Sequence, residues 1–130
     1  MPESKAATAT TVAVIGASND RAKFGNKAVR AFARQGYHVV PINPRERQVE
    51  GWPAYRSVLE VAEAIEMATF YVPPAVGEQV IDEVARKGIA EVWLNPGSES
   101  DALVAKARAH GIETIVACSI LGIGESPGKY

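Results

Sequence analysis

Short apolar runs alternate with longer amphipathic segments along the chain. The short runs are rich in β-branched and aromatic residues, as expected for parallel strands that are buried on both faces. We predict strands at Thr11–Ile15, His38–Ile42, Met67–Tyr71, Glu91–Leu94 and Glu113–Ala117. Apolar residues at helical spacing, together with capping signals, predict helices at about Asn26–Gln35, Ser57–Ala64, Ala75–Lys87 and Ser98–His110. In the third helix, Val76, Val80, Ile81 and Val84 share one face, which we assign to the core.

Three joins between a helix and the next strand repeat one arrangement. A polar helix end is followed by a glycine, an apolar residue and then a strand, at Gly36, Gly88 and Gly111. Each glycine can adopt the left-handed conformation that ends a helix. Repeated joins of this kind indicate βαβ units. We therefore predict an α/β protein with a Rossmann-like, doubly wound, five-stranded parallel sheet of order 3-2-1-4-5 and helices on both faces.

Length and composition indicate one globular domain. The chain has 130 residues, of which 47% are hydrophobic and 22% charged, and no apolar run approaches membrane-spanning length. We expect a flexible lead-in at residues 1–10, a folded domain at 11–123 and a loose tail at 124–130. The N-terminus lacks the apolar stretch of a signal peptide, and one cysteine excludes an internal disulfide, so we expect a cytoplasmic location. The two histidines show no metal-ligand spacing, and no metal site is predicted.

The net charge of −1 hides a basic segment. Between Asp20 and Arg47 the chain carries seven Lys and Arg residues against two carboxylates, a net charge of +5. A basic segment on an otherwise acidic protein favours a compact anionic ligand over a nucleic acid.

The first predicted strand is followed by a glycine, a polar loop and a helix that begins near Gly25. Loop amides and the N–H groups of the first helical turn then converge on one place, where the helix dipole favours an anion. We expect a phosphate there, close enough to Gly16 that any side chain at this position would occupy its space.

Ligands of doubly wound sheets bind outside the carboxyl ends of the strands, and we place the switch point between the first and fourth strands. The segments selected by this rule are Gly16–Asn19, Pro41–Arg45, Val72–Pro74, Asn95–Gly97 and Cys118–Ser119. They contain no Ser-His-Asp set, Cys-His set or carboxylate pair, so we expect a binding module rather than an enzyme. Cys118 is either a buried structural cysteine or a thiol able to form a mixed disulfide with a thiol ligand.

Two features depart from the dinucleotide fingerprint. Gly16 and Gly25 are nine residues apart, so the loop is not GxGxxG. The acidic residue that would hold an NAD ribose after the second strand is missing, and Asn43-Pro44-Arg45 stands there with Arg47 beyond. Cations at this tip favour a phosphorylated ribose, which both NADP and coenzyme A (CoA) carry.

Three motifs together resemble the CoA-binding domain family. They are Val14-Ile15-Gly16-Ala17-Ser18-Asn19, Val40-Pro41-Ile42-Asn43-Pro44 and Tyr71-Val72-Pro73-Pro74, in that order at the ends of three strands. The family includes small stand-alone bacterial proteins and the CoA-binding domain of the succinyl-CoA synthetase α subunit. Trp93–Gly97 and Cys118 also resemble the stand-alone members.

The resemblance implies a Rossmann-like fold that binds CoA or an acyl-CoA. The diphosphate would lie on the first loop and the start of its helix, the adenosine near the second strand's tip, and the pantetheine along Val72–Pro74. The implied cofactor-binding residues are Gly16, Ala17, Ser18, Asn19, Arg21, Lys23, Phe24, Gly25, Asn26, Pro41, Asn43, Pro44, Arg45, Val72, Pro73, Pro74, Asn95 and Gly97. Neither His38 nor His110 matches the phosphorylated histidine of the synthetase, which lies in a second domain, so ligase activity is not expected from this chain alone.

Two other functions fit the same residues. One is an NADP- or nucleotide-binding sensor or oxidoreductase-related domain. The other is an interaction subunit with a vestigial nucleotide site, for which an exposed Trp52 and Tyr55 would form the most visible surface. The sequence indicates no nucleic-acid or membrane partner, and it does not identify a protein partner or an oligomeric state.

Overall fold

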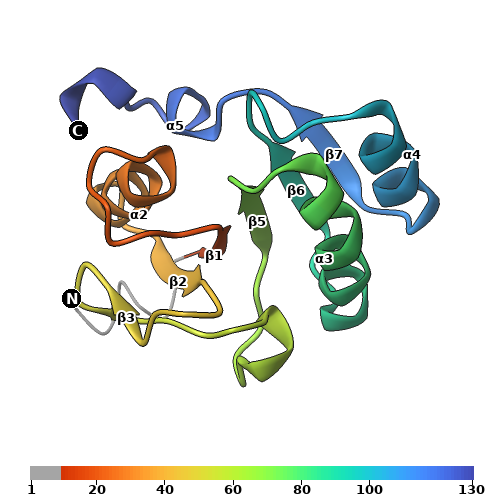
Figure 1. Ribbon diagram of the computed structural model, residues 1–130, viewed down its shortest axis with the longest axis horizontal. Helices are drawn as coiled ribbons and strands as arrows, with labels where there is room; N and C mark the ends of the chain where they lie inside the picture. Colours follow the sequence, from red (N-terminus) through yellow and green to blue (C-terminus); the bar gives the residue numbers. More distant parts are fainter. Residues whose placement is uncertain (1–9) are drawn as a thin grey trace.

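The computed structural model describes residues 10–130 and contains a five-stranded parallel sheet. The lead-in expected at residues 1–10 lies, except for Thr10, outside the described residues. The strands are β1 (Thr11–Ile15), β2 (His38–Ile42), β5 (Met67–Phe70), β6 (Glu91–Leu94) and β7 (Glu113–Val116). Every neighbouring pair of these strands is parallel, which confirms the predicted α/β class (Figure 1).

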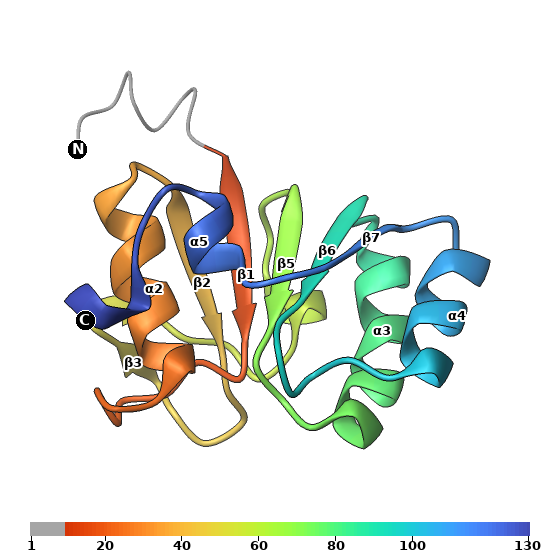
Figure 2. The same ribbon diagram turned by 90° about the horizontal axis from the view of Figure 1, so that it is seen from above.

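Helices cover both faces of the sheet (Figure 2). The long helix α2 (Phe24–Arg34) and the short α5 (Ser119–Gly122) lie on one face, and α3 (Pro74–Lys87) and α4 (Asp101–Ala109) lie on the other. Two separate clusters of buried apolar side chains fill these layers, one around Phe32 of α2 and one around Phe70, Ile81 and Leu103. Each cluster removes apolar surface from water, and this burial holds the helices on the sheet.

The helix-to-strand joins have the predicted geometry. Gly88 ends α3 with a φ of +88°, and the N–H of Ile89 donates to the carbonyl of Val84 at 3.2 Å. Ile89 then packs in the core at 2% exposure. Gly36 and Gly111 also have positive φ, so the three joins are built alike.

The observed strand order differs from the predicted order in the position of one strand, Met67–Phe70. The observed order is β2-β1-β5-β6-β7, so Met67–Phe70 pairs with β1 rather than lying outside β2. The place outside β2 is taken by Tyr55, which forms one parallel bridge with Ile42. If Tyr55 is counted as the third strand along the chain, β5 and β6 become the fourth and fifth. The order is then the predicted 3-2-1-4-5, with β7 added at the far edge. At this bridge the N–H of Tyr55 donates to the carbonyl of Pro41 at 3.0 Å, and the carbonyl of Tyr55 accepts from the N–H of Asn43 at 2.9 Å.

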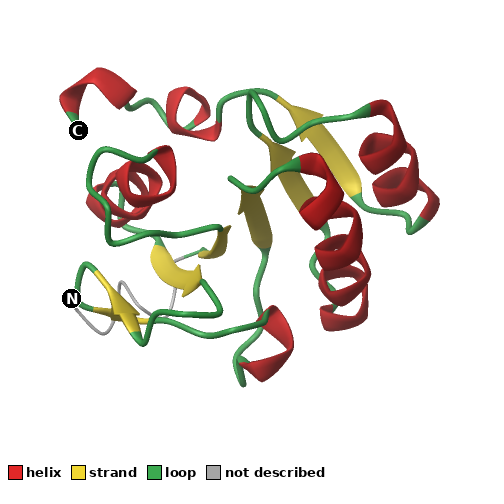
Figure 3. Cartoon of the chain, in the orientation of Figure 1, coloured by secondary structure: helices red, strands yellow, loops and turns green. Residues whose placement is uncertain are grey.

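The second predicted helix is wrong, and the fourth starts later than expected. In place of Ser57–Ala64 the chain forms one 3₁₀ turn, η1 (Val58–Glu60), followed by an irregular segment (Figure 3). The N-cap of α4 is Ser100, whose hydroxyl accepts from the N–H of Leu103 at 3.1 Å. The predicted start, Ser98, lies two residues before this N-cap. Both serines precede the helix, and either could cap it by sequence alone.

Two segments differ from the expectations: Trp52 and Tyr55 are not fully exposed, and residues 124–130 are not a loose tail. Trp52 and Tyr55 are half-buried at the edge of the sheet. Trp52 belongs to β4 (Trp52–Pro53), which forms a short hairpin with β3 (Gln48–Val49), and its ring packs edge-on against His38. The C-terminal residues, expected to be loose, lie against α2 and include the 3₁₀ turn η2 (Pro127–Lys129). Among the described residues, no helix is long and apolar enough to cross a membrane.

Candidate functional site

The carboxyl ends of β1, β2 and β5 bring three of the predicted segments together. Ile15 stands opposite Ile42 on one side and Phe70 on the other. The N–H of Gly16 donates to the carbonyl of Ile42 at 3.1 Å, and the N–H of Tyr71 donates to the carbonyl of Ile15 at 2.8 Å. The switch point therefore lies between β1 and β5, not between β1 and the fourth predicted strand.

Gly16 and Gly25 are required by the packing of the chain on itself. A Cβ at Gly16, whose φ is +90°, would lie 2.6 Å from the carbonyl oxygen of Tyr71 and 2.9 Å from Cγ1 of Val72. A Cβ at Gly25 would collide with the carbonyl oxygen of Gly16. A side chain at Gly16 would therefore meet the backbone after β5, and the expectation that it would occupy a phosphate's space stays a prediction.

The loop between these glycines leaves the start of α2 open. The N–H of Asp20 donates to Ser18 Oγ at 3.0 Å and the N–H of Ala22 donates to Asp20 Oδ1 at 3.0 Å, so the loop holds its own turn. Lys23 is the N-cap residue of α2, and its side chain makes no capping hydrogen bond. In the first turn of α2 the N–H of Asn26 donates to the carbonyl of Lys23 at 3.0 Å, whereas the N–H groups of Phe24 and Gly25 have no acceptor within residues 10–130, and the turn holds no acidic residue. This end of the helix therefore presents donors and positive potential.

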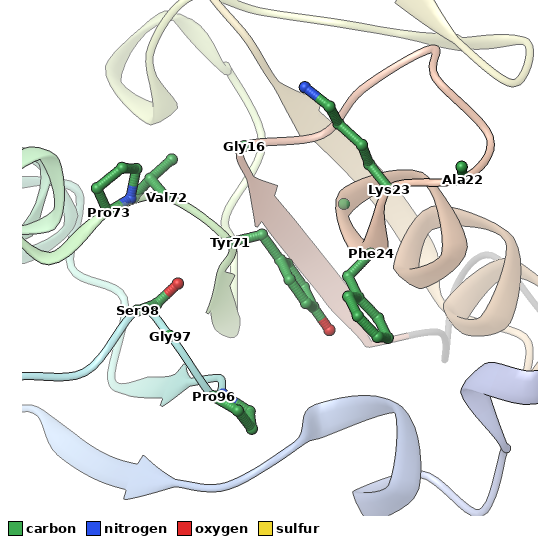
Figure 4. A pocket seen from close by; sticks show the side chains of 11 residues that line it. Gly16, Ala22, Lys23, Phe24, Tyr71, Val72, Pro73, Pro96, Gly97 and Ser98 are labelled. Carbon is green, nitrogen blue, oxygen red and sulfur yellow. The ribbon is translucent and has the colours of Figure 1, made fainter.

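A cavity of about 420 Å³ lies against this helix start (Figure 4). Its walls come from the first loop and α2, from the segment after β5, and from the segment after β6. The lining includes the predicted residues Gly16, Lys23, Phe24, Gly25, Val72, Pro73 and Gly97, together with Ala22, Tyr71, Pro96 and Ser98. Lys23 is exposed, so an anion bound here would meet one mobile cation and the helix dipole together.

A second cavity of about 570 Å³ shares Gly16, Val72 and Pro73 with the first and extends toward the tip of β2. Asn43, Pro44 and Arg45 line it, as predicted, and so does Arg56, which was not predicted. The Arg56 guanidinium contacts the carboxylate of Glu60 at 3.0 Å. Its place at the site follows from the bridge of Tyr55 to β2, which the three residues between Pro53 and Ser57 do not reveal by any pattern in the sequence.

The cations of the basic segment divide into free and paired ones. Arg21 forms an ion pair with Glu50 at 3.3 Å and so faces the β3–β4 hairpin. Arg45 is exposed, and its guanidinium takes part in none of the ion pairs found within residues 10–130. Arg45 and Lys23 are therefore better placed than Arg21 to meet an anion in the cavities.

The four asparagines predicted for the site hold its loops in place. Asn19 donates to Glu46 Oε1 and to the carbonyl of Gln48, and Asn43 donates to the carbonyl of Ala17 at 2.7 Å. The fully buried Asn26 donates to the carbonyl of Ser18 and to Glu50 Oε2. Asn95 donates to Thr69 Oγ1 and to the carbonyl of Phe70. Of the other predicted residues, Ala17 and Pro41 are buried and Pro74 begins α3.

A third, smaller cavity of about 160 Å³ continues from the first and shares Phe24, Tyr71 and Pro96 with it. Cys118 and Pro127 complete its largely apolar lining with Asn95. Burial raises the pKa of the Tyr71 phenol to about 12, and its hydroxyl bonds with Ser119 Oγ at 3.0 Å. The phenol therefore stays neutral near pH 7. Cys118 is half-exposed rather than buried, and neither histidine lines any of the three cavities.

Comparison with known proteins gives concordant matches. A family described as CoA binding domain matches residues 10–123. The α subunit of an ADP-forming acetate–CoA ligase II from Pyrococcus furiosus is 39% identical over 84 residues, which are 64% of this chain and 18% of that protein. The matched regions cover 11% to 29% of the curated relatives, so the chain spans less than a third of their length.

Solved structures agree with the fold. A conserved hypothetical protein from Pyrococcus furiosus superposes with a TM-score of 0.81 at 32% identity, over 87% of this chain and 98% of that one. A dinucleotide-forming acetyl-coenzyme A synthetase from Candidatus Korarchaeum cryptofilum, in complex with phosphate and ADP, gives a TM-score of 0.74 at 27% identity. That match covers 83% of this chain and 25% of the synthetase chain.

Proposed function

The chain belongs to the CoA-binding domain family, and we propose that it holds CoA or an acyl-CoA along the row of three cavities at the carboxyl edge of its sheet. The observation that carries this proposal is that neighbouring cavities share their walls. The first and second share Gly16, Val72 and Pro73, and the first and third share Phe24, Tyr71 and Pro96. An elongated ligand with an anionic middle fits such a row.

Charge orients the ligand in this proposal. CoA carries a 3′-phosphate on its ribose, and the second cavity has Arg45 and Arg56 on its wall. The diphosphate then lies in the first cavity, beside Lys23 and the first turn of α2. The pantetheine arm follows Val72 and Pro73 and ends in the apolar third cavity near Phe24 and Cys118.

We propose that the chain binds the cofactor without carrying out chemistry by itself. His38 contacts Glu63 and His110 contacts Asp82, and both pairs lie outside the cavities. The neutral Tyr71 phenol is held by Ser119, so it is a poor base near pH 7. The curated relatives are named as ligases, and this chain covers only a small part of their length. A cytoplasmic location stays a prediction from the sequence.

A panel of cofactors tests this function. Purified protein is titrated calorimetrically with CoA, acetyl-CoA, NADP and NAD, and its thermal unfolding is followed with each. CoA or acetyl-CoA should bind selectively and raise the unfolding temperature, since a ligand that binds only the folded state stabilises it. Selective binding of NADP would instead favour the nucleotide-sensor function, and binding of none of the four would leave an interaction subunit.

A further inference from the structure

The cavity assigned to adenosine contains one carboxylate that the binding of an anionic cofactor does not explain. Glu83 lines this cavity together with Arg45 and Arg56. A carboxylate close to a bound phosphate repels it, so Glu83 lowers affinity unless it makes a favourable contact with another part of the ligand.

Glu83 is held in one orientation by the neighbouring 3₁₀ turn. The hydroxyl of Ser57 donates to Glu83 Oε1 at 2.7 Å, and Ser57 is itself fixed because its Oγ accepts from the N–H of Leu59 at 3.1 Å. The second carboxylate oxygen, Oε2, makes no hydrogen bond within residues 10–130. One acceptor therefore remains available at the cavity wall.

The rest of this wall is apolar. Val76 and Val80 of α3, which the sequence assigned to the core, line the cavity, and Val76 is 43% exposed. Ile42, at the end of β2, and Val72, which follows β5, also line this cavity. A flat group with apolar faces and a polar edge suits such a lining. In CoA, that group is the adenine base.

We propose that Glu83 selects the base: its Oε2 accepts a hydrogen bond from the 6-amino group of adenine and rejects purines with a 6-oxo group. This proposal rests on the proposed function. An ionised carboxylate can only accept hydrogen bonds, and the 6-amino group of adenine donates. A 6-oxo group also only accepts, so it would leave two acceptors facing each other without a proton between them.

The test compares CoA with the CoA analogue in which hypoxanthine replaces adenine, by calorimetry on the whole chain. Wild-type protein should prefer CoA by about 10- to 150-fold, the range of a charged hydrogen bond. Glu83→Gln should lose most of this preference, because its amide can donate to the 6-oxo group. Glu78→Gln, on the same helix but outside the cavity, should keep the full preference, and Ser57→Ala should keep most of it.

The outcomes separate this proposal from the proposed function. If wild-type protein binds both compounds equally, base selection by Glu83 is refuted and CoA binding stands. If Glu83→Gln binds both compounds more tightly by the same factor, Glu83 only repels the phosphates and the proposal also fails. If neither compound binds, the proposed function fails with it. The wild-type comparison needs no variant, so it can refute base selection even if Glu83→Gln does not fold.

Discussion

The close approach of Gly25 to the carbonyl of Gly16 sets the geometry of the first loop. The start of α2 is drawn against the end of β1, which points the first turn of the helix into the cavity. Gly16 and Gly25 have the roles of two glycines of the shorter dinucleotide fingerprint, although they are nine residues apart. Gly16 lies at the turn, and Gly25 lies where the helix contacts the strand. The loop between them is long enough to carry Lys23 to the cavity wall.

Gly25→Ala should destabilise the fold. The added methyl group collides with the carbonyl oxygen of Gly16, which is backbone and cannot rotate away. Overpacking of this kind costs about 1–3 kcal/mol. Urea unfolding measures the free energy, with Gly128→Ala as the control because its Cβ would meet only Ser126 Oγ, at 3.7 Å. Equal stability of the two variants would show that the loop can move away from the helix.

Arg45 should contact the 3′-phosphate of CoA. Wild-type protein should bind CoA about 10-fold more tightly than dephospho-CoA, the lower end for a charged hydrogen bond because Arg45 is exposed. Arg45→Ala should remove most of this difference, and added salt should reduce it in the wild type. Calorimetry with both ligands measures the ratio, and Arg108→Ala on α4 is the control. Equal affinities in wild-type protein would show that Arg45 is only a solvated loop cation.

Two elements that look peripheral in the sequence support the site. The β3–β4 hairpin holds the first loop through Glu46 and Glu50, which bind Asn19, Asn26 and Arg21. The C-terminal segment supplies Pro127 to the third cavity and packs its last residue on α2, where the Arg30 guanidinium carbon lies 5.4 Å from the centre of the Tyr130 ring. The C-terminal segment therefore completes the wall of the third cavity, whereas the hairpin holds in place the loop that leads to the first cavity.

The C-terminal segment should loosen in acid. Gln35 and Tyr130 donate hydrogen bonds to Glu125, and these bonds hold the pKa of its carboxyl below the ordinary 4.5. A carboxyl whose pKa is lowered on folding stabilises the protein above its unfolded pKa and loses this effect as the pH falls through the folded value. The free energy of unfolding should thus fall as the pH drops below the ordinary value of 4.5, and less steeply in Glu125→Gln.

Urea unfolding at a series of pH values measures this slope. Hydrogen bonds from His110 and Lys106 also lower the pKa of Asp82. The free energy of unfolding therefore has a second acid-dependent contribution, from the α3–α4 face. Asp82→Asn is therefore the matched control for Glu125→Gln. Identical slopes for Glu125→Gln and wild-type protein would mean that the bonds to Glu125 contribute nothing to folding.

The molecule as a whole places its groove where the two helical layers meet. The chain leaves β1 toward α2 on one face and leaves β5 toward α3 on the other (Figure 2). Ligand crevices form at such a switch point, and the first two cavities lie at this place. Its walls come from the segments that follow β1, β2, the Tyr55 bridge, β5, β6 and β7. The far edge, with β7 and α4, contributes nothing to the three cavities.

CoA should protect these loops selectively from amide hydrogen exchange. Protection is expected at residues 16–25, 43–45, 71–76 and 95–98, because they line the cavities, and not at β7 or α4. Dephospho-CoA should give the same pattern with weaker protection at 43–45. Mass spectrometry of peptic fragments locates the change, and protection confined to β7 and α4 would move the site to the other edge.

The sequence by itself determined the class of the fold and the position of the anion loop. β-branched runs, glycine-ended helices and the Gly16 turn are local signals, each readable from a few neighbouring residues, and they are confirmed at the five strands and at α2 and α3. The placement of Arg45 at the second cavity also follows from local information, since the tip of β2 must lie at the carboxyl edge of a parallel sheet.

Only the tertiary structure decided the strand order and the direction in which polar side chains point. Tyr55 takes the outer place through a single bridge, a pairing between distant segments that leaves no periodic pattern in the sequence. That bridge brings Arg56 to the groove, and the 3₁₀ turn after it brings Ser57 to Glu83. An asparagine has the same donors whether its acceptor is a ligand or a loop carbonyl, so only the folded chain shows that Asn26 and Asn43 hold loops.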